Sequence, residues 1–271
     1  MTSPVCESNP VILKIPALTR SLKIFIHGPE DKFVSRQIRK TGIWEPYETS
    51  LVLGFLQSDS VFVDVGANIG YFSIVAASGL GPAGKVIAFE PDPANFRLLL
   101  ASCALNDVQS RIEAVEAGLS AASGAGHLYL SEDNLGDHQI YAGEGSRESL
   151  PIKLYNGSDY LRPRITRMDL LKVDTQGSEY EVMLGLLPLL QELPRAPRII
   201  IELTPFSLRE AGASGRKLIE LLATLDQPFW IIDHIEHRLA ASNAAELAQW
   251  CDNVDGSTGD RGFMNILLGP R

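Results

Sequence analysis

Short apolar runs alternate with helical segments along most of this 271-residue chain, and this alternation restricts its fold more than any other feature. Segments with helical spacing, such as 71–78 and 93–106, separate the runs. Strands that alternate with helices form a mostly parallel sheet covered on both faces. We therefore expect an α/β, doubly wound fold, with its ligand beyond the carboxyl ends of the strands. The seven expected strands are 61–65, 85–90, 111–117, 170–174, 198–203, 229–233 and 264–268.

Two parts of the chain depart from this alternation. Residues 1–57 read as an N-terminal cap region, with short strands at 11–15 and 22–27 and helices at 34–40 and 47–56, leading into a main domain over 58–271. Segments 127–130 and 150–155 predict an inserted β-hairpin. The polar loop that joins them, 131–149, is either a surface loop or part of a binding site.

The net charge of −9 at pH 7 disfavours nucleic acid as a partner, because the molecule as a whole repels a phosphate backbone. Segment 11–40 is the exception, with seven basic residues against two acidic ones. This segment is either a solvated face or a platform for an anionic substrate.

The cysteines and the hydropathy pattern indicate a cytoplasmic protein. Cys6, Cys103 and Cys251 are far apart and odd in number, which fits neither a disulfide framework nor a zinc site. No apolar run approaches the ~18 residues of a membrane span, and the N-terminus lacks the pattern of a signal peptide.

The segment 64–70, Asp-Val-Gly-Ala-Asn-Ile-Gly, closes the first predicted strand of the main domain and opens a helix. Gly66 permits a tight turn and close approach of a ligand, and Gly70 lets the helix lie close to the strand. N–H groups at the helix start can meet a carboxylate. Asp64 could accept a hydrogen bond from the ammonium group of the same ligand.

The glycine spacing distinguishes between two possible nucleotide-like ligands, NAD and S-adenosylmethionine. A dinucleotide fold requires G-x-G-x-x-G, whereas here Asn68 stands two positions after Gly66 and the glycines follow G-x-x-x-G. This pattern favours S-adenosylmethionine over NAD. Glu90, at the end of the next strand, can bind ribose hydroxyls in either case, so it supports a nucleoside ligand without choosing between them.

Five ordered motifs resemble those of the FkbM-type methyltransferases: Trp-Glu-Pro at 44–46, the segment 64–72, Phe-Glu-Pro at 89–91 with Asn95, the segment 171–179, and Ile-Ile-Glu at 200–202. The likeness covers residues 40–205. It implies a seven-stranded Rossmann-like class I methyltransferase fold, the cofactor S-adenosylmethionine, and methylation mostly of hydroxyls on natural products and glycans. In that family the fourth motif often reads Asp-Val-Glu-Gly, and here Gln176 stands in place of the glutamate.

The same resemblance assigns site residues. It implies that Asp174 lies beside the transferred methyl group and also contacts the donor. It places the adenine near Ala117 and Gly118. The remaining donor-binding positions are Asp64, Gly66, Ala67, Asn68, Gly70 and Glu90.

Methyl transfer to an alcohol benefits from a general base, because the hydroxyl proton must leave during attack. His138 in the polar loop is our first candidate, His234 after the strand 229–233 is the second, and Asp174 is the third. A variant of this mechanism would bind Mg²⁺ through Asp133, Asp137 and Asp174, but our leading interpretation includes no metal.

We therefore expect an S-adenosylmethionine-dependent O-methyltransferase that acts on a small molecule or a glycan. The alternatives are an N-methyltransferase, a protein or RNA methyltransferase, and a non-catalytic donor-binding module of the same fold. The least patterned regions, which are the cap, the loop 131–149 and the tail after residue 204, would select the acceptor.

Overall fold

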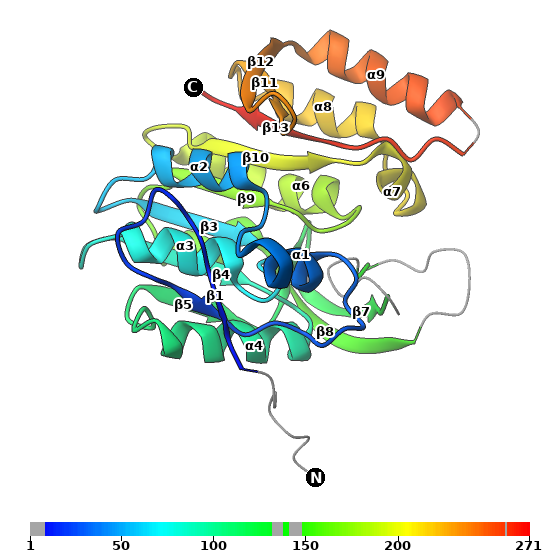
Figure 1. Cartoon of the computed structure of the whole chain (residues 1–271). Helices are drawn as coiled ribbons and strands as arrows, with labels where there is room; N and C mark the ends of the chain where they lie inside the picture. Colours follow the sequence, from blue (N-terminus) through cyan, green and yellow to red (C-terminus); the bar gives the residue numbers. More distant parts are fainter. Residues whose placement is uncertain (1–8, 132–137, 141–147, 258) are drawn as a thin grey trace.

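An eight-stranded sheet forms the centre of the computed structural model, which describes residues 9–131, 138–140, 148–257 and 259–271 (Figure 1). Its strand order is β12-β11-β13-β10-β9-β3-β4-β5. All seven predicted strands belong to it: β3 (Val61–Val65), β4 (Lys85–Phe89), β5 (Ile112–Val115), β9 (Leu170–Val173), β10 (Arg198–Leu203), β11 (Phe229–Asp233) and β13 (Met264–Leu268).

The eighth strand, β12 (Arg238–Ser242), was not predicted. Its sequence, Arg-Leu-Ala-Ala-Ser, lacks the β-branched and aromatic residues that favour strands. It forms because it pairs antiparallel with β11 at the edge of the sheet. The expectation of seven strands is thus wrong by one.

The sheet is mostly parallel, as predicted. Strands β10, β9, β3, β4 and β5 pair in parallel, whereas β13 runs antiparallel to both β10 and β11. The carboxyl ends of the parallel strands therefore meet at one edge of the sheet.

Helices cover both faces of the sheet, so the doubly wound prediction is also confirmed (Figure 1). Four helices pack on what we call the cap face: α1 (Val34–Thr41), α2 (Pro46–Phe55), α3 (Tyr71–Gly79) and α4 (Pro93–Leu105). Five pack on the opposite face, which we call the apolar face: α5 (Gly157–Leu161), α6 (Glu179–Glu192), α7 (Pro205–Glu210), α8 (Gly215–Ala223) and α9 (Ala244–Gly256).

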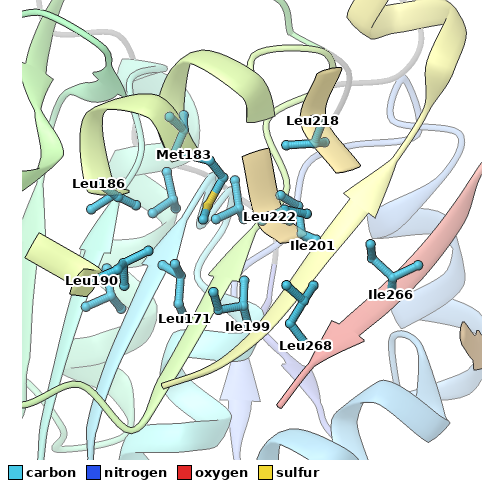
Figure 2. Packing of buried hydrophobic residues seen from close by; sticks show 14 of the residues in the cluster. Leu171, Met183, Leu186, Leu190, Ile199, Ile201, Leu218, Leu222, Ile266 and Leu268 are labelled. Atoms are coloured by element: carbon cyan, nitrogen blue, oxygen red, sulfur yellow. The ribbon is translucent and has the colours of Figure 1, made fainter. Parts of the chain in front are cut away.

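Aliphatic side chains fill the apolar face. Figure 2 shows Leu171, Ile199 and Ile201 of the sheet beside Met183 and Leu186 of α6. These five side chains are at most 1% exposed. Because successive side chains of a strand point to opposite faces, the residues between them lie on the cap face.

The cap face combines apolar and polar positions on the same strands. Near the start of β3, β9 and β10 it carries Phe62, Leu170 and Ile200, all in the cluster that includes the cap helices. Two residues further along each strand, the same face carries polar groups. With a fourth from β13, they form what we call the polar seam: Asp64, Lys172, Glu202 and Asn265.

The N-terminal region packs into this same core. Its strands β1 (Val11–Ile12) and β2 (Lys23–Ile24) are shorter than predicted and pair only with each other. The end of α4 holds the second strand, since the Lys23 N–H donates to Asn106 Oδ1 at 2.9 Å. Helices α1 and α2 lie within one residue of their predicted bounds and contribute Ile38 and Val52 to the cluster that contains Phe62.

The predicted hairpin is present in a three-stranded sheet, in which His127 pairs with Pro151. Its order is β6 (Gly118–Ser120), β8 (Ser149–Asn156) and β7 (Gly124–Tyr129). Asp133, Asn134 and Asp137 lie outside the described residues. Over the part of the chain that the structure describes, no helix has the length and apolarity needed to cross a membrane.

Candidate active site

A cavity of about 370 Å³ lies at the carboxyl ends of the parallel strands, where the topology predicts a ligand. Its wall includes Gly66, Ala67 and Asn68 after β3, Glu90 after β4 and Asp174 after β9. The cap closes another side with Trp44 and Glu45. The volume lies within the ~300–1,000 Å³ that small-molecule sites occupy.

The two glycines of the β3–α3 loop are required by close packing. Gly66 has φ +82°, and a Cβ there would collide with the backbone carbonyl of Asp174. Gly70 has φ +85°, and a Cβ there would lie 2.8 Å from Leu99 Cγ of α4. The sequence therefore predicted the tight turn, but Gly70 makes room for a neighbouring helix and not for the strand.

The N–H groups at the start of the loop are already used within the protein. Those of Gly66 and Ala67 donate to the carbonyl of Phe89 at 3.0 and 2.9 Å. The Asn68 N–H donates to Glu90 Oε2 at 2.7 Å. These three groups therefore fix the loop against the end of β4, and they are not the N–H groups at the start of α3 that we expect to meet a carboxylate.

Three of the predicted donor-binding residues do not line the cavity. Asp64 is 1% exposed and accepts a hydrogen bond from Ser73 Oγ at 2.6 Å, and burial raises its pKa. Gly70 packs on α4, and Ala117 is fully buried before β6. The position of Asp64 behind the wall does not suit direct contact with an ammonium group.

Glu90 has the geometry expected of a ribose-binding carboxylate. It lines the cavity, is 5% exposed, and accepts N–H bonds from Asn68 and, at 2.8 Å, from Asp92. Burial raises the pKa of Glu90 to about 8. Nearby, Gly118, Leu119 and Ile140 provide an apolar wall that suits an adenine ring.

At the β9 end of the cavity, Asp174 belongs to a network of charged groups. Its Oδ2 accepts a hydrogen bond from Lys172 Nζ at 2.8 Å, and its Oδ1 accepts one from Gln176 Nε2 at 2.9 Å. Gln176 Nε2 also lies 3.4 and 3.3 Å from the two oxygens of Glu202. Gln176 therefore joins two carboxylates that a glutamate at the same position would repel.

The network changes the proton affinity of its members. Burial, and then the charge of Asp174, raises the pKa of Glu202 to about 8. Burial works to lower the pKa of Lys172, but the charges of Asp174, Glu48 and other nearby acids raise it overall. Lys172 therefore stays charged, whereas Glu202 can exchange a proton near neutral pH.

The family model described as the methyltransferase FkbM domain matches residues 64–229, which include the loop after β3, Glu90, Asp174 and Glu202. The chain belongs to this FkbM methyltransferase family. Its membership confirms the resemblance seen in the sequence motifs.

The relatives of this FkbM-family chain include the two described next. Methyltransferase sdnD of Sordaria araneosa is 31% identical over 160 residues, which are 48% of this chain and 61% of that protein. Hexuronic acid methyltransferase AglP of Haloferax volcanii is 29% identical over 222 residues, which are 79% of this chain and 84% of that protein. The chain thus spans about three fifths of sdnD.

Among solved structures, the FkbM chain is similar to precorrin 8w decarboxylase of Methanobacterium thermoautotrophicum. The TM-score is 0.48 at 13% identity, and the match covers 91% of this chain and 97% of that one.

S-adenosylmethionine is the cofactor of FkbM methyltransferases, and the residues present fit it. Glu90 has the acceptor oxygens that two ribose hydroxyls need, and the wall at Gly118 and Leu119 suits an adenine. Asp174 and Glu202 line the same cavity and would be neighbours of the bound cofactor. When bound, the cofactor supplies an electrophilic methyl group.

The two histidines that we predicted as bases do not line the cavity of this FkbM protein. His138 Nδ1 accepts a hydrogen bond from the Ser131 N–H at 3.0 Å, and its Nε2 lies 3.7 Å from Asp92. His234 lies beyond the seam, with Nε2 3.4 Å from Asn265 Nδ2. Burial, and then His237, lowers the pKa of His234. Neither position suits direct proton transfer in the cavity.

Three charged residues of the site were not predicted from the sequence: Glu45, Lys172 and Glu202. All three lie within the motifs 44–46, 171–179 and 200–202, and Lys172 and Glu202 also place a charge within an apolar strand, so the sequence carried a signal for them. Glu45 is the N-cap residue of α2 and has a left-handed conformation with φ 39°. Burial, and then the charge of Glu48, raises the pKa of Glu45.

Proposed function

We propose that this FkbM protein transfers the methyl group of S-adenosylmethionine to a hydroxyl oxygen of a small molecule or sugar. The observation that carries the proposal is one cavity with Glu90 at the end of β4 and a further group of carboxylates, Asp174, Glu202 and Glu45. Carboxylates accept hydrogen bonds from hydroxyl groups, whereas they repel phosphate and other anions. The second group therefore favours an acceptor rich in hydroxyls over a nucleic acid.

In the proposed reaction, the protein holds donor and acceptor in line in a site shielded from water. Glu90 and the apolar wall bind the adenosine, and Asp174 is fixed by Lys172 and Gln176 at the acceptor end. Glu202 takes the proton of the acceptor hydroxyl as the new O–C bond forms and the C–S bond breaks. Its pKa of about 8 suits this role, since an efficient base has a pKa near the working pH.

The named relatives support a sugar or natural-product acceptor. AglP is a hexuronic acid methyltransferase by name, and its match extends over 79% of this chain. The cavity presents the carboxylates of Asp174, Glu202 and Glu45, so a sugar with free hydroxyl groups is a suitable first acceptor to test.

Calorimetry and product analysis test the two halves of the proposal. We expect S-adenosylmethionine and S-adenosylhomocysteine to bind with one site per chain. Incubation of donor with a panel of monosaccharides, uronic acids and hydroxylated aromatics should give a methyl ether, identified by mass spectrometry and NMR; a methyl ester would instead show transfer to a carboxyl group. A matched panel of amines should give no product.

Each other outcome contradicts a stated part of the proposal. Absence of donor binding removes the cofactor assignment. Methylated amines as the main product would identify an N-methyltransferase. Donor binding without turnover over the whole panel would favour a non-catalytic module. Methylation of RNA, with affinity that falls steeply with salt, would overturn the small-molecule assignment.

A further inference from the structure

Three side chains that could bind a metal ion lie together at the far end of the polar seam. Glu45 is the N-cap residue of α2, Glu48 lies in its first turn, and His234 follows β11. One ligand atom from each of the three can be chosen so that all lie within 4.8 Å of one another. Atoms bound to one ion by bonds of ~2.0–2.2 Å are at most ~4.4 Å apart, so small side-chain rotations would close the site.

The carboxylates of this group have unused acceptor oxygens. Glu48 is fully buried, and neither its Oε1 nor Oε2 of Glu45 has a hydrogen-bond donor among the described residues. Lys172 Nζ lies 3.8 Å from Glu48 Oε1, but it directs its hydrogen bond to Asp174 at 2.8 Å. A buried carboxylate oxygen without a donor costs free energy, and a bound cation removes that cost.

Asn265 independently indicates a bound ion at this position, because its buried side chain has an oxygen without a partner in the part of the chain that the structure describes. It is 6% exposed, and its Nδ2 lies 2.7 Å from Glu48 Oε2, 3.5 Å from Glu45 Oε1 and 3.4 Å from His234 Nε2. Its Oδ1 has no hydrogen-bond partner among the described residues. A half-turn of the amide would exchange the two atoms and turn this oxygen toward the three ligands.

We propose that Glu45, Glu48 and His234 bind a first-row divalent metal ion, with Asn265 Oδ1 as a fourth ligand. Two carboxylates balance the charge of a divalent ion. One imidazole nitrogen with two or three oxygens is typical of Mn²⁺, Fe²⁺ or Zn²⁺ sites, whereas Mg²⁺ and Ca²⁺ prefer oxygen alone. The ion would lie beside the cavity, because Glu45 also lines it. This inference does not rest on the methyl-transfer reaction.

Metal titration of the whole chain tests the proposal directly. The protein is first treated with a chelator and then titrated with Mn²⁺ and, separately, with Zn²⁺, using calorimetry and, for Mn²⁺, electron paramagnetic resonance. We expect one ion per chain. Glu48→Gln and His234→Ala should each weaken binding at least tenfold, whereas the exposed His127→Ala is the matched control and should bind like the wild type.

The variant Asn265→Asp distinguishes between two explanations for the carboxylate oxygens that have no donor among the described residues: that they bind a metal ion, or that Glu45 and Glu48 share a proton. The added carboxylate should destabilise the metal-free protein and tighten metal binding, so Mn²⁺ should raise its melting temperature more than that of the wild type. Far-UV circular dichroism checks that each variant folds, and His234→Ala changes a side chain that is 34% exposed.

Two results would overturn the metal site: no binding of either ion, or unchanged affinity in the folded His234→Ala and Glu48→Gln variants. Binding of S-adenosylhomocysteine, measured in the same preparations, reports separately on the methyltransferase proposal.

Discussion

The two faces of the central sheet use the same strands for different purposes. On the apolar face, Leu171, Ile199 and Ile201 pack among the aliphatic side chains of α6 and α8 (Figure 2). On the cap face, one residue along the same strands, Lys172 and Glu202 form ionic and polar contacts. A shift of one position in the sequence therefore separates the residues that stabilise the fold from those that can bind a ligand.

The difference teaches where this fold tolerates charge. Helices α6, α8 and α9 cover the apolar face with aliphatic side chains, whereas the cavity at the carboxyl ends of the strands takes part of its wall from the cap region and α3, through Trp44, Glu45 and Phe72. Charged groups at the carboxyl ends of the strands are stable there because they bind one another, and we expect bound ligands to complete them. Substitutions on the two faces should therefore affect different measurements.

The largest effect should come from the polar seam. Glu202→Gln removes the proposed base and should lower kcat by about 10²–10⁴-fold. Donor affinity and melting temperature should change little, because a neutral amide replaces a carboxyl whose pKa is raised to about 8. In the wild type, kcat should rise with pH up to about 8, and in the variant this rise should disappear. A normal kcat in Glu202→Gln would exclude this residue as the base; Glu192→Gln, on the surface, is the control.

Lys172→Met should cost about 3–5 kcal/mol of unfolding free energy, since it leaves the buried carboxylate of Glu48 and the half-buried carboxylate of Asp174 without their cation. This loss of unfolding free energy should grow from pH 5 to pH 8. Over that range the buried acids with raised pKa values become ionised in the folded state, whereas the same acids are already ionised in the unfolded chain. Urea unfolding at both pH values measures it. Leu171→Met, on the apolar face, is the matched control and should cost less than ~1.5 kcal/mol. Equal losses in the two variants would remove the distinction between the faces.

Leu186→Ala tests the apolar face alone. Leu186 is fully buried between α6 and the sheet, so its truncation should cost about 2–5 kcal/mol through lost contacts and the cavity left behind. Affinity for S-adenosylhomocysteine should stay at the wild-type value below the melting transition. Ile201→Val, a smaller truncation on the same face, should cost about 0.5–1.5 kcal/mol. A large loss of donor affinity in either variant would show that the two faces are coupled.

Glu90→Gln should weaken S-adenosylhomocysteine binding by about 1.5–3 kcal/mol, the value of hydrogen bonds to a charged group. In the free protein the pKa of Glu90 is about 8, and ribose hydroxyls favour its ionised form, so binding at pH 7 should release a proton. Wild-type affinity should therefore rise from pH 6 to pH 8. Calorimetry in buffers of different ionisation enthalpy measures how many protons are released on binding. If the Glu90→Gln variant still releases a proton, the proton comes from another group.

The smallest effect concerns Gln176. Gln176→Glu places a carboxylate against Asp174 and Glu202, and it should lower the unfolding free energy by about 1–2 kcal/mol at pH 8. At pH 5 the loss should almost vanish, because the new acid is then protonated in the folded state and the repulsion is removed. Gln191→Glu, exposed on α6, is the control and should show no such pH dependence.

Much of the fold could be predicted because its signals are local. The seven apolar runs, the glycine turn at 66–70 and the acid at the end of β4 each lie within a few consecutive residues. The edge strand β12 could not, since its weak sequence becomes a strand only by pairing with β11. The two histidines proposed as bases were chosen from their places in the sequence, and neither lines the cavity.

The sequence by itself determined seven strands of the central sheet, the family motifs and the position of Glu90, since these depend on neighbours along the chain. Only the tertiary structure decided what surrounds the polar seam. Glu48 and Asn265 are 217 residues apart in sequence, yet their side chains are hydrogen bonded at 2.7 Å. Folding of the cap helix α2 onto the far end of the sheet brings them together. Burial of that contact, and the resulting need to compensate its charge, cannot be read from either segment alone.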